Sequence, residues 1–147
     1  MAPLSISPTL EQFQTLAARG RLIPVWIDLL ADAETPVSAF QKLDSGGYSF
    51  LLESAEKSPK AGRYSFVGAD PRFLLESRGR TIRITENGIA REFETQSDPL
   101  SELEILMQSF GWVKPEALED AEGPRFSGGA IGFLSYNAVH FFEPSVE

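Results

Sequence analysis

Residues 73–94 read FLLESRGRTIRITENGIAREFE, and this stretch decides the fold. Its segments 72–78, 80–86 and 89–94 are rich in apolar and β-branched residues and are separated by short turn signals. Asn87-Gly88 is the strongest two-residue signal for a β-hairpin, and Gly79 permits a tight turn between the first two segments. The stretch therefore predicts three consecutive antiparallel strands.

The pentapeptide FLLES occurs twice, at 50–54 and at 73–77. Nothing else aligns at this offset and no third copy is present, so the sequence does not indicate a repeat array. Strands are expected at 48–54 and 63–68 as well as at 72–78, so both copies lie on strands. Only the first copy borders a loop, at 55–62, that is long enough to wrap a ligand. The first copy is therefore the candidate site, and the second copy is interpreted as part of a strand without a binding role.

Three helices are expected, and a further strand at 22–30. Each helix follows a capping signal and ends at glycine: Thr9 with Gln12 and then Gly20, Thr35-Pro36 and then Gly46-Gly47, Asp98-Pro99 and then Gly111. In the second helix, the side chains expected to face inward are Val37, Phe40 and Leu43. Hairpin signals dominate, so the sequence predicts an α+β fold, mostly antiparallel β-sheet with helices packed on one face.

Length and composition predict one domain, 1–147, with a core of its own. The chain has no cysteine, no apolar run near the roughly 20 residues that cross a bilayer, and no basic leader before an apolar stretch. These features favour a cytoplasmic protein. The net charge of −8 argues against nucleic acid or a membrane surface as a partner.

The charge is unevenly distributed, because residues 57–83 carry seven basic side chains against two acidic ones, a local net charge of +5. Two interpretations stay open. Long basic side chains on strands and turns are commonly solvated. Alternatively, the segment contains an anion site.

No conventional catalytic constellation is present in the sequence, and no metal site is predicted. His140 is the only histidine, which excludes a two-histidine metal motif. GGAIG at 128–132 lacks the spacing of a dinucleotide-binding loop, and we interpret it as a strand that another backbone approaches closely. The residues alone indicate an α+β domain with a pocket for a small anion or zwitterion.

Two longer motifs, LLESAEKSPKAGRYSFVGADP at 51–71 and FSGGAIGFLSYNAVHFFEP at 126–144, resemble the amino-terminal region of anthranilate synthase component I. The resemblance covers nearly the whole chain. Aminodeoxychorismate synthase component I shares much of this pattern and is the alternative family. A stand-alone, non-catalytic ligand-binding module is the alternative from another functional class.

The resemblance implies an activity that lies mostly outside this chain. Enzymes of this family convert chorismate to anthranilate and pyruvate with Mg²⁺ and with ammonia from a glutamine amidotransferase partner. Their catalytic and metal residues lie in a carboxyl-terminal chorismate-binding domain that this chain does not include. The resemblance therefore implies no catalytic residue and no cofactor within 1–147, and an inactive isolated chain.

The resemblance also implies part of a feedback site for L-tryptophan. It places the site on the LLES motif and on the returning strand: Leu51, Leu52, Glu53, Ser54, Arg63, Tyr64, Ser65 and Phe66. Glu53 would accept from the ammonium, the two serines would hydrogen-bond, Leu52, Tyr64 and Phe66 would pack the ring, and Arg63 or Lys60 would face the carboxylate. Core packing for Leu52 and Phe66, and a solvated Arg63, are the alternative interpretations.

A last expectation concerns the carboxyl-terminal segment. In the intact enzymes the 126–136 motif would pack against the catalytic half. Without that partner, apolar surface would be exposed at Ile131, Phe133, Val139, Phe141 and Phe142. Exposed apolar patches favour association, so we expect a homo-oligomer.

Overall fold

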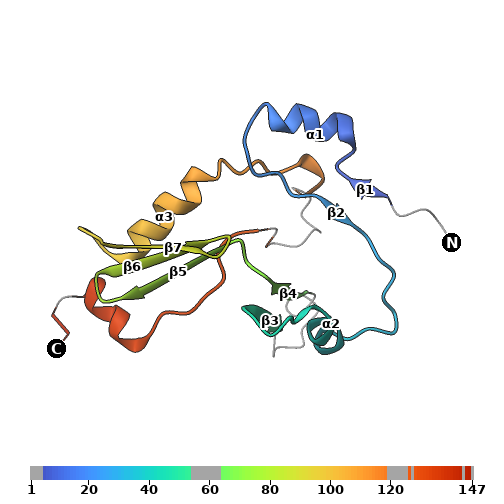
Figure 1. Ribbon diagram of the computed structural model, residues 1–147. Coiled ribbons are helices and arrows are strands. Elements are labelled where there is room, and N and C mark those ends of the chain that lie inside the picture. Colours follow the sequence, from blue (N-terminus) through green and yellow to red (C-terminus); the bar gives the residue numbers. More distant parts are fainter. Residues whose placement is uncertain (1–4, 54–63, 119–125, 127, 144, 147) are drawn as a thin grey trace. The chain divides into compact units, whose positions relative to one another are not determined.

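The computed structural model describes residues 5–53, 64–118, 126, 128–143 and 145–146 (Figure 1). Within it the chain divides into two compact units. The first contains residues 1–72 and 110–127, and the second contains residues 73–109 and 128–147. Helices and antiparallel sheets occur together, so the predicted α+β class is confirmed.

The second unit is built on a three-stranded antiparallel sheet in the order β5-β6-β7. The strands are β5 (Phe73–Arg78), β6 (Thr81–Glu86) and β7 (Ile89–Glu94), as the opening stretch predicts. Asn87 and Gly88 both have positive φ, 50° and 79°, as the two-residue hairpin requires. Gly79, at φ 59°, makes the other turn. The turn chemistry therefore fixes the register of all three strands.

The two faces of this sheet differ in polarity. Side chains alternate along a strand, so Ile82 and Ile84 share one face, and Ile82 has no exposed surface. On the opposite face Arg83 lies between Glu76 and Glu92 in the register, and its Nε is 3.9 Å from the Glu92 carboxylate. Figure 1 shows helix α3 (Pro99–Ser109) alongside the sheet. The buried isoleucines form most of the apolar core that the described residues contain.

Helix α3 begins where Asp98 caps its first turn. The Asp98 carboxylate accepts hydrogen bonds from the backbone N–H groups of Leu100 and Ser101 and from the Ser101 hydroxyl. The hydrogen bonds from Ser101, mainly from its hydroxyl, lower the pKa of Asp98 because they stabilise the charged form. The buried Thr95 hydroxyl donates to Glu102 at 2.5 Å, which ties the first turn of the helix to the end of β7.

The first unit begins with β1 (Ile6–Ser7), α1 (Leu10–Ala17) and β2 (Trp26–Ile27), and β1 pairs antiparallel with β2. The predicted capping box of Thr9 and Gln12 is present. After α1 the backbone N–H of Arg21 donates to the carbonyl of Gly111 at 3.0 Å. A β-carbon at Gly20 would lie 2.2 Å from that same carbonyl oxygen. Glycine at position 20 is therefore required for two backbone segments to approach each other.

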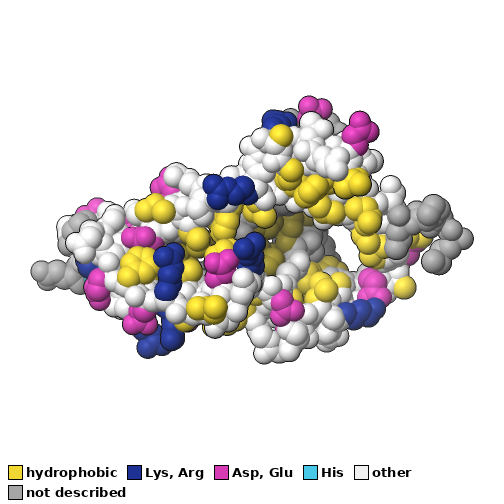
Figure 2. Space-filling model, turned by 45° about the horizontal axis from the view of Figure 1, so that its top comes forward, with side chains coloured by type: hydrophobic (Ala, Val, Ile, Leu, Met, Phe, Trp, Pro, Cys, Tyr) yellow, Lys and Arg dark blue, Asp and Glu magenta, His cyan; other side chains and the backbone are white. Residues whose placement is uncertain are grey.

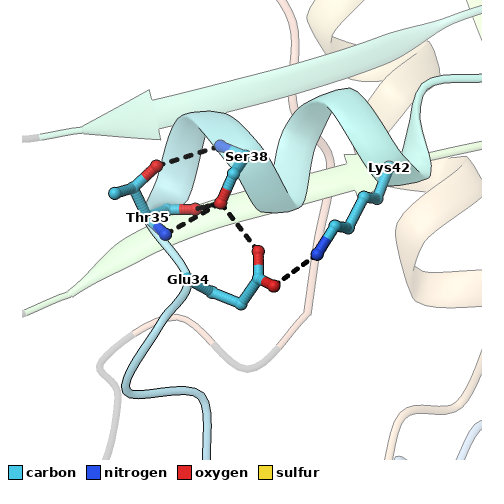
Figure 3. A network of polar contacts seen from close by, with 4 residues as sticks. All are labelled: Glu34, Thr35, Ser38 and Lys42. Carbon is cyan, nitrogen blue, oxygen red and sulfur yellow. Dashed lines mark hydrogen bonds and ion pairs between the residues drawn. The ribbon is translucent and has the colours of Figure 1, made fainter.

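The first unit also contains helix α2 (Pro36–Leu43), strands β3 (Ser49–Glu53) and β4 (Ser65–Ala69), and the short 3-10 helix η1 (Glu116–Leu118). Thr35 caps α2, as predicted, and exchanges hydrogen bonds with Ser38 (Figure 3). Glu34 accepts from the Ser38 hydroxyl at 2.7 Å and pairs with Lys42. The hydrogen bond from Lys42, with that from Ser38, lowers the pKa of Glu34.

Three local expectations are wrong. The predicted strand 22–30 is reduced to β2 and one bridge between Leu22 and Trp112, because Pro24 has no N–H and the flanking residues find no partner in the described chain. The GGAIG segment is not a strand, and Gly128 and Gly129 have positive φ. Helix α2 buries no residue fully, and Val37 and Leu43 are exposed.

Hydrophobic side chains reach the surface in both units (Figure 2). In the carboxyl-terminal segment Ile131, Phe133 and Phe142 are exposed, as expected, and Phe133 retains 93% of its surface. Val139 and Phe141 are half-buried instead, in the short 3-10 helix η2 (Tyr136–Phe141). Self-association through such surface stays a prediction.

Substituting Gly20 by alanine tests the close approach of residues 20 and 111. The new methyl group would overlap the Gly111 carbonyl oxygen and the Val113 side chain, so we expect the free energy of unfolding to fall by about 1–3 kcal/mol. Thermal or denaturant unfolding measures the loss. Gly132→Ala is the matched control, because among the described residues no atom lies within 4 Å of the position that its new methyl group would take. An equal effect of the two substitutions would contradict the close approach.

The lowered pKa of Asp98 predicts a pH dependence of stability. A carboxylate whose pKa is lower in the folded state stabilises that state fully above the unfolded-state value, about 3.9. This contribution disappears as the pH falls through the folded-state pKa. We therefore expect the melting temperature of the wild-type chain to approach that of Asp98→Asn as the pH is lowered from 6 toward about 2. A difference that is constant with pH would contradict this.

Candidate functional site

The β3–β4 hairpin carries six of the eight predicted site residues. Leu51, Leu52 and Glu53 lie on β3, whereas Ser65 and Phe66 lie on β4 and Tyr64 precedes it. The register pairs Glu53 with Ser65, Leu52 with Phe66 and Leu51 with Val67. Ser54 and Arg63, as well as Lys60, lie outside the described residues. Antiparallel pairing therefore brings the described residues of the two motifs, LLES and RYSF, to the same end of one hairpin.

The pleat divides these residues between two faces of the hairpin. Leu52 and Phe66 share one face, and Leu51, Glu53 and Ser65 lie on the other, because successive side chains alternate. Leu52 is 45% exposed, and Glu53 and Ser65 are also exposed. The apolar and the polar parts of the candidate site are thus adjacent along the strands but face opposite ways.

Three aromatic rings form a row on the apolar face. The centroids of Tyr64 and Phe66 are 6.4 Å apart, and Phe66 meets Phe126 edge to face at 5.4 Å with an interplanar angle of 87°. Such pairs contribute about 0.5–1.5 kcal/mol beyond burial. Tyr64 is 36% exposed, so part of the row is accessible to a ligand. Phe126 is not predictable as a neighbour of Phe66 from the sequence, because no local pattern links it to a strand so far away along the chain.

The second FLLES has a different environment. Its Ser77 lies on β5 opposite Ile82, and Arg78 is opposite Thr81 at the turn through Gly79. The strand therefore passes directly into the next one.

A separate cavity of about 410 Å³ lies on the sheet of the second unit. It is lined by residues at the hairpin end of the β5–β7 sheet: Phe73, Ile84, Glu86, Asn87, Ile89 and Arg91. None of these belongs to the predicted site. We assign the candidate site to the β3–β4 hairpin, because both motifs converge there.

Other site types lack support in the part of the chain that the structure describes. No group of three or more His, Cys, Asp or Glu side chains within it could hold a metal ion. No helix in those residues has the length and apolar character needed to span a bilayer. The ring of His140 is 2.9 Å from the Val146 carbonyl through Nδ1, a local contact in the carboxyl-terminal segment.

Comparison with known proteins shows which proteins this chain is similar to in sequence. The chain is 39% identical over 142 residues to anthranilate synthase component 1 of Aquifex aeolicus, which is 96% of this chain and 28% of that protein. It is 41% identical over 143 residues to the protein of the same name from Synechocystis, covering 96% of this chain and 27% of the relative. To anthranilate synthase component 1 of Acetivibrio thermocellus it is 36% identical over 137 residues, which cover 92% of this chain and 26% of that protein.

By its fold the chain belongs to the α+β class of domains. Its β3–β4 hairpin pairs the strands that carry the described residues of LLES and RYSF. Over nearly its whole length the chain is homologous to a region of anthranilate synthase component 1, so the resemblance found in the motifs is confirmed. The chain spans about a quarter of the length of these curated relatives. No family model and no solved structure matches the chain.

Proposed function

We propose that this chain is the amino-terminal region of an anthranilate synthase component I in tryptophan biosynthesis. The intact enzyme would convert chorismate to anthranilate and pyruvate in the cytoplasm, using ammonia from a glutamine amidotransferase partner. The observation that carries this proposal is the 39–41% identity, over 96% of the chain, to relatives that bear this name.

The chemistry would reside outside these 147 residues. The full-length enzyme would use Mg²⁺, but the described residues offer no set of side chains that fits a metal ion. We therefore assign no catalytic step and no metal ligand to this chain. Its role in the intact enzyme would be regulatory.

We further propose that the β3–β4 hairpin supplies part of a feedback site for L-tryptophan. A bound amino acid needs an acceptor for its ammonium group and apolar walls for its indole ring. Glu53 offers the acceptor, and Leu52, Tyr64 and Phe66 offer apolar surface on the opposite face. Consecutive residues of a strand are only about 3.3 Å apart. A ligand lying across the end of the hairpin, rather than flat on one face, can therefore contact both sets.

Tryptophan would inhibit by shifting a conformational equilibrium of the intact enzyme. A ligand changes such an equilibrium only by its different affinities for the two states, which typically amounts to about 1–3 kcal/mol of coupling. The remainder of the pocket would come from outside this chain. The isolated chain would then bind tryptophan weakly.

Anthranilate formation tests the proposed activity. The full-length protein, supplied with chorismate, Mg²⁺ and ammonia, should produce fluorescent anthranilate, whereas the 147-residue chain should produce none because it lacks the catalytic part. A full-length protein that forms aminodeoxychorismate instead would support the folate-pathway alternative. Anthranilate from the short chain above a no-protein control would contradict the assignment of catalysis outside it.

The two FLLES copies supply a matched pair of substitutions for the feedback site. In the full-length enzyme Ser54→Ala should raise the tryptophan concentration for half-inhibition, by about fivefold or more if it removes the smallest typical coupling. Ser77→Ala should not raise it, because Ser77 lies on β5 opposite Ile82 in the other unit. Inhibition curves at fixed chorismate measure both. Equal effects, or none from Ser54→Ala, would remove the reason for placing the site at the first copy.

A further inference from the structure

The aromatic ring of Phe50 lies over Gly68 on the neighbouring strand. The two residues are direct partners in the antiparallel register of β3 and β4. A β-carbon built on Gly68 would lie 2.4 Å from Cε1 and 2.7 Å from Cζ of the Phe50 ring. Real carbon atoms do not approach this closely, since ordinary contacts begin near about 3.5 Å. The ring therefore occupies the space that any other residue at 68 would fill with its side chain.

Glycine is needed at position 68 because it has no side chain to collide with the Phe50 ring, and not because the backbone there has an unusual conformation. Its φ lies outside the left-handed region, in contrast to Gly46, Gly79 and Gly88 in the turns. Glycine within a strand weakens it unless something compensates, and a ring from the partner strand is such a compensation. Phe50 and Gly68 thus form a complementary pair that no other pairing of these two strands reproduces.

A shift of the register would break this fit. Moved by one residue, Phe50 would face Val67 or Ala69, and every side chain of one strand would change faces. The pair stands three positions from the Glu53–Ser65 pair on β3 and β4. The intervening pairs, Leu51 with Val67 and Leu52 with Phe66, contain no glycine over which a ring could lie. Only the observed register places Phe50 opposite Gly68, the single glycine of these two strands.

We propose that Phe50 and Gly68 are positioning residues for the tryptophan response, an inference that rests on the proposed function. By fixing the register, they keep Glu53 opposite Ser65 and Leu52 beside Phe66 at the ligand end of the hairpin. Neither residue touches the ligand. They act through the residues that do.

Four variants of the full-length enzyme test the proposal: Gly68→Ala, Phe50→Val, the double variant, and Gly47→Ala as control. Valine suits a strand but lacks the ring that reaches over position 68. Gly47 lies in the same unit and has no positive φ, and a methyl group added there would lie no closer than 3.8 Å to any atom in the part of the chain that the structure describes. Inhibition curves with tryptophan, the KM for chorismate and thermal unfolding are measured for each.

We expect Gly68→Ala to raise the half-inhibitory tryptophan concentration about fivefold or more, and more than it raises the KM for chorismate. In the Phe50→Val background the same substitution should have a much smaller effect, because the clash is absent. Such non-additivity is the mark of residues in contact. The control should match the wild type.

The remaining outcomes either contradict the proposal or, in one case, support it. If Gly68→Ala has the same effect with phenylalanine or valine at position 50, the two residues are not a unit. If Gly68→Ala does not fold, rescue of folding by Phe50→Val supports the pair, and failure of rescue contradicts it. Normal inhibition of Gly68→Ala by tryptophan refutes the positioning role alone, whereas a wild type that tryptophan does not inhibit refutes the proposed function as well.

Discussion

Antiparallel pairing in a fixed register is the constraint on which the rest of this structure depends. The described residues contain little buried apolar surface, so the sheets are not held in place by a large core. Register is set by local devices instead. Asn87-Gly88 and Gly79 set it in the β5–β7 sheet, and we propose that the Phe50 ring on Gly68 sets it between β3 and β4. The candidate site depends on that second register, because it pairs Glu53 with Ser65 and Leu52 with Phe66 at one end of the hairpin.

The small core has a physical consequence for the chain as a whole. Large apolar side chains such as Leu30, Phe133 and Tyr136 keep most of their surface exposed. Soluble domains rarely leave so many apolar side chains uncovered without a partner surface. This agrees with a chain that corresponds to about a quarter of the length of its curated relatives.

Local signals were predicted well from the sequence, and distant ones were not. The capping box of Thr9 and Gln12, the start of α2 at Thr35 and the hairpin at Asn87 depend on residues a few positions apart, so the pattern contains the information. The Phe66–Phe126 contact and the fit of Phe50 on Gly68 depend on pairing between separate strands or segments. GGAIG was predicted as a strand from its composition, but a strand needs a partner, and none lies beside it in the described residues. The predicted site residues were placed on one hairpin by their motifs, whereas their division between two faces became clear only from the register.

Hydrogen exchange in the full-length enzyme, with and without tryptophan, tests the central claim most directly. If the β3–β4 hairpin forms part of the feedback site, the backbone amides of Ser49–Glu53 and Ser65–Ala69 should exchange more slowly when tryptophan is bound. The amides of β5, with the second FLLES, should exchange at unchanged rates. Slower exchange confined to β5–β7, or no change in the hairpin at saturating tryptophan, would contradict the claim.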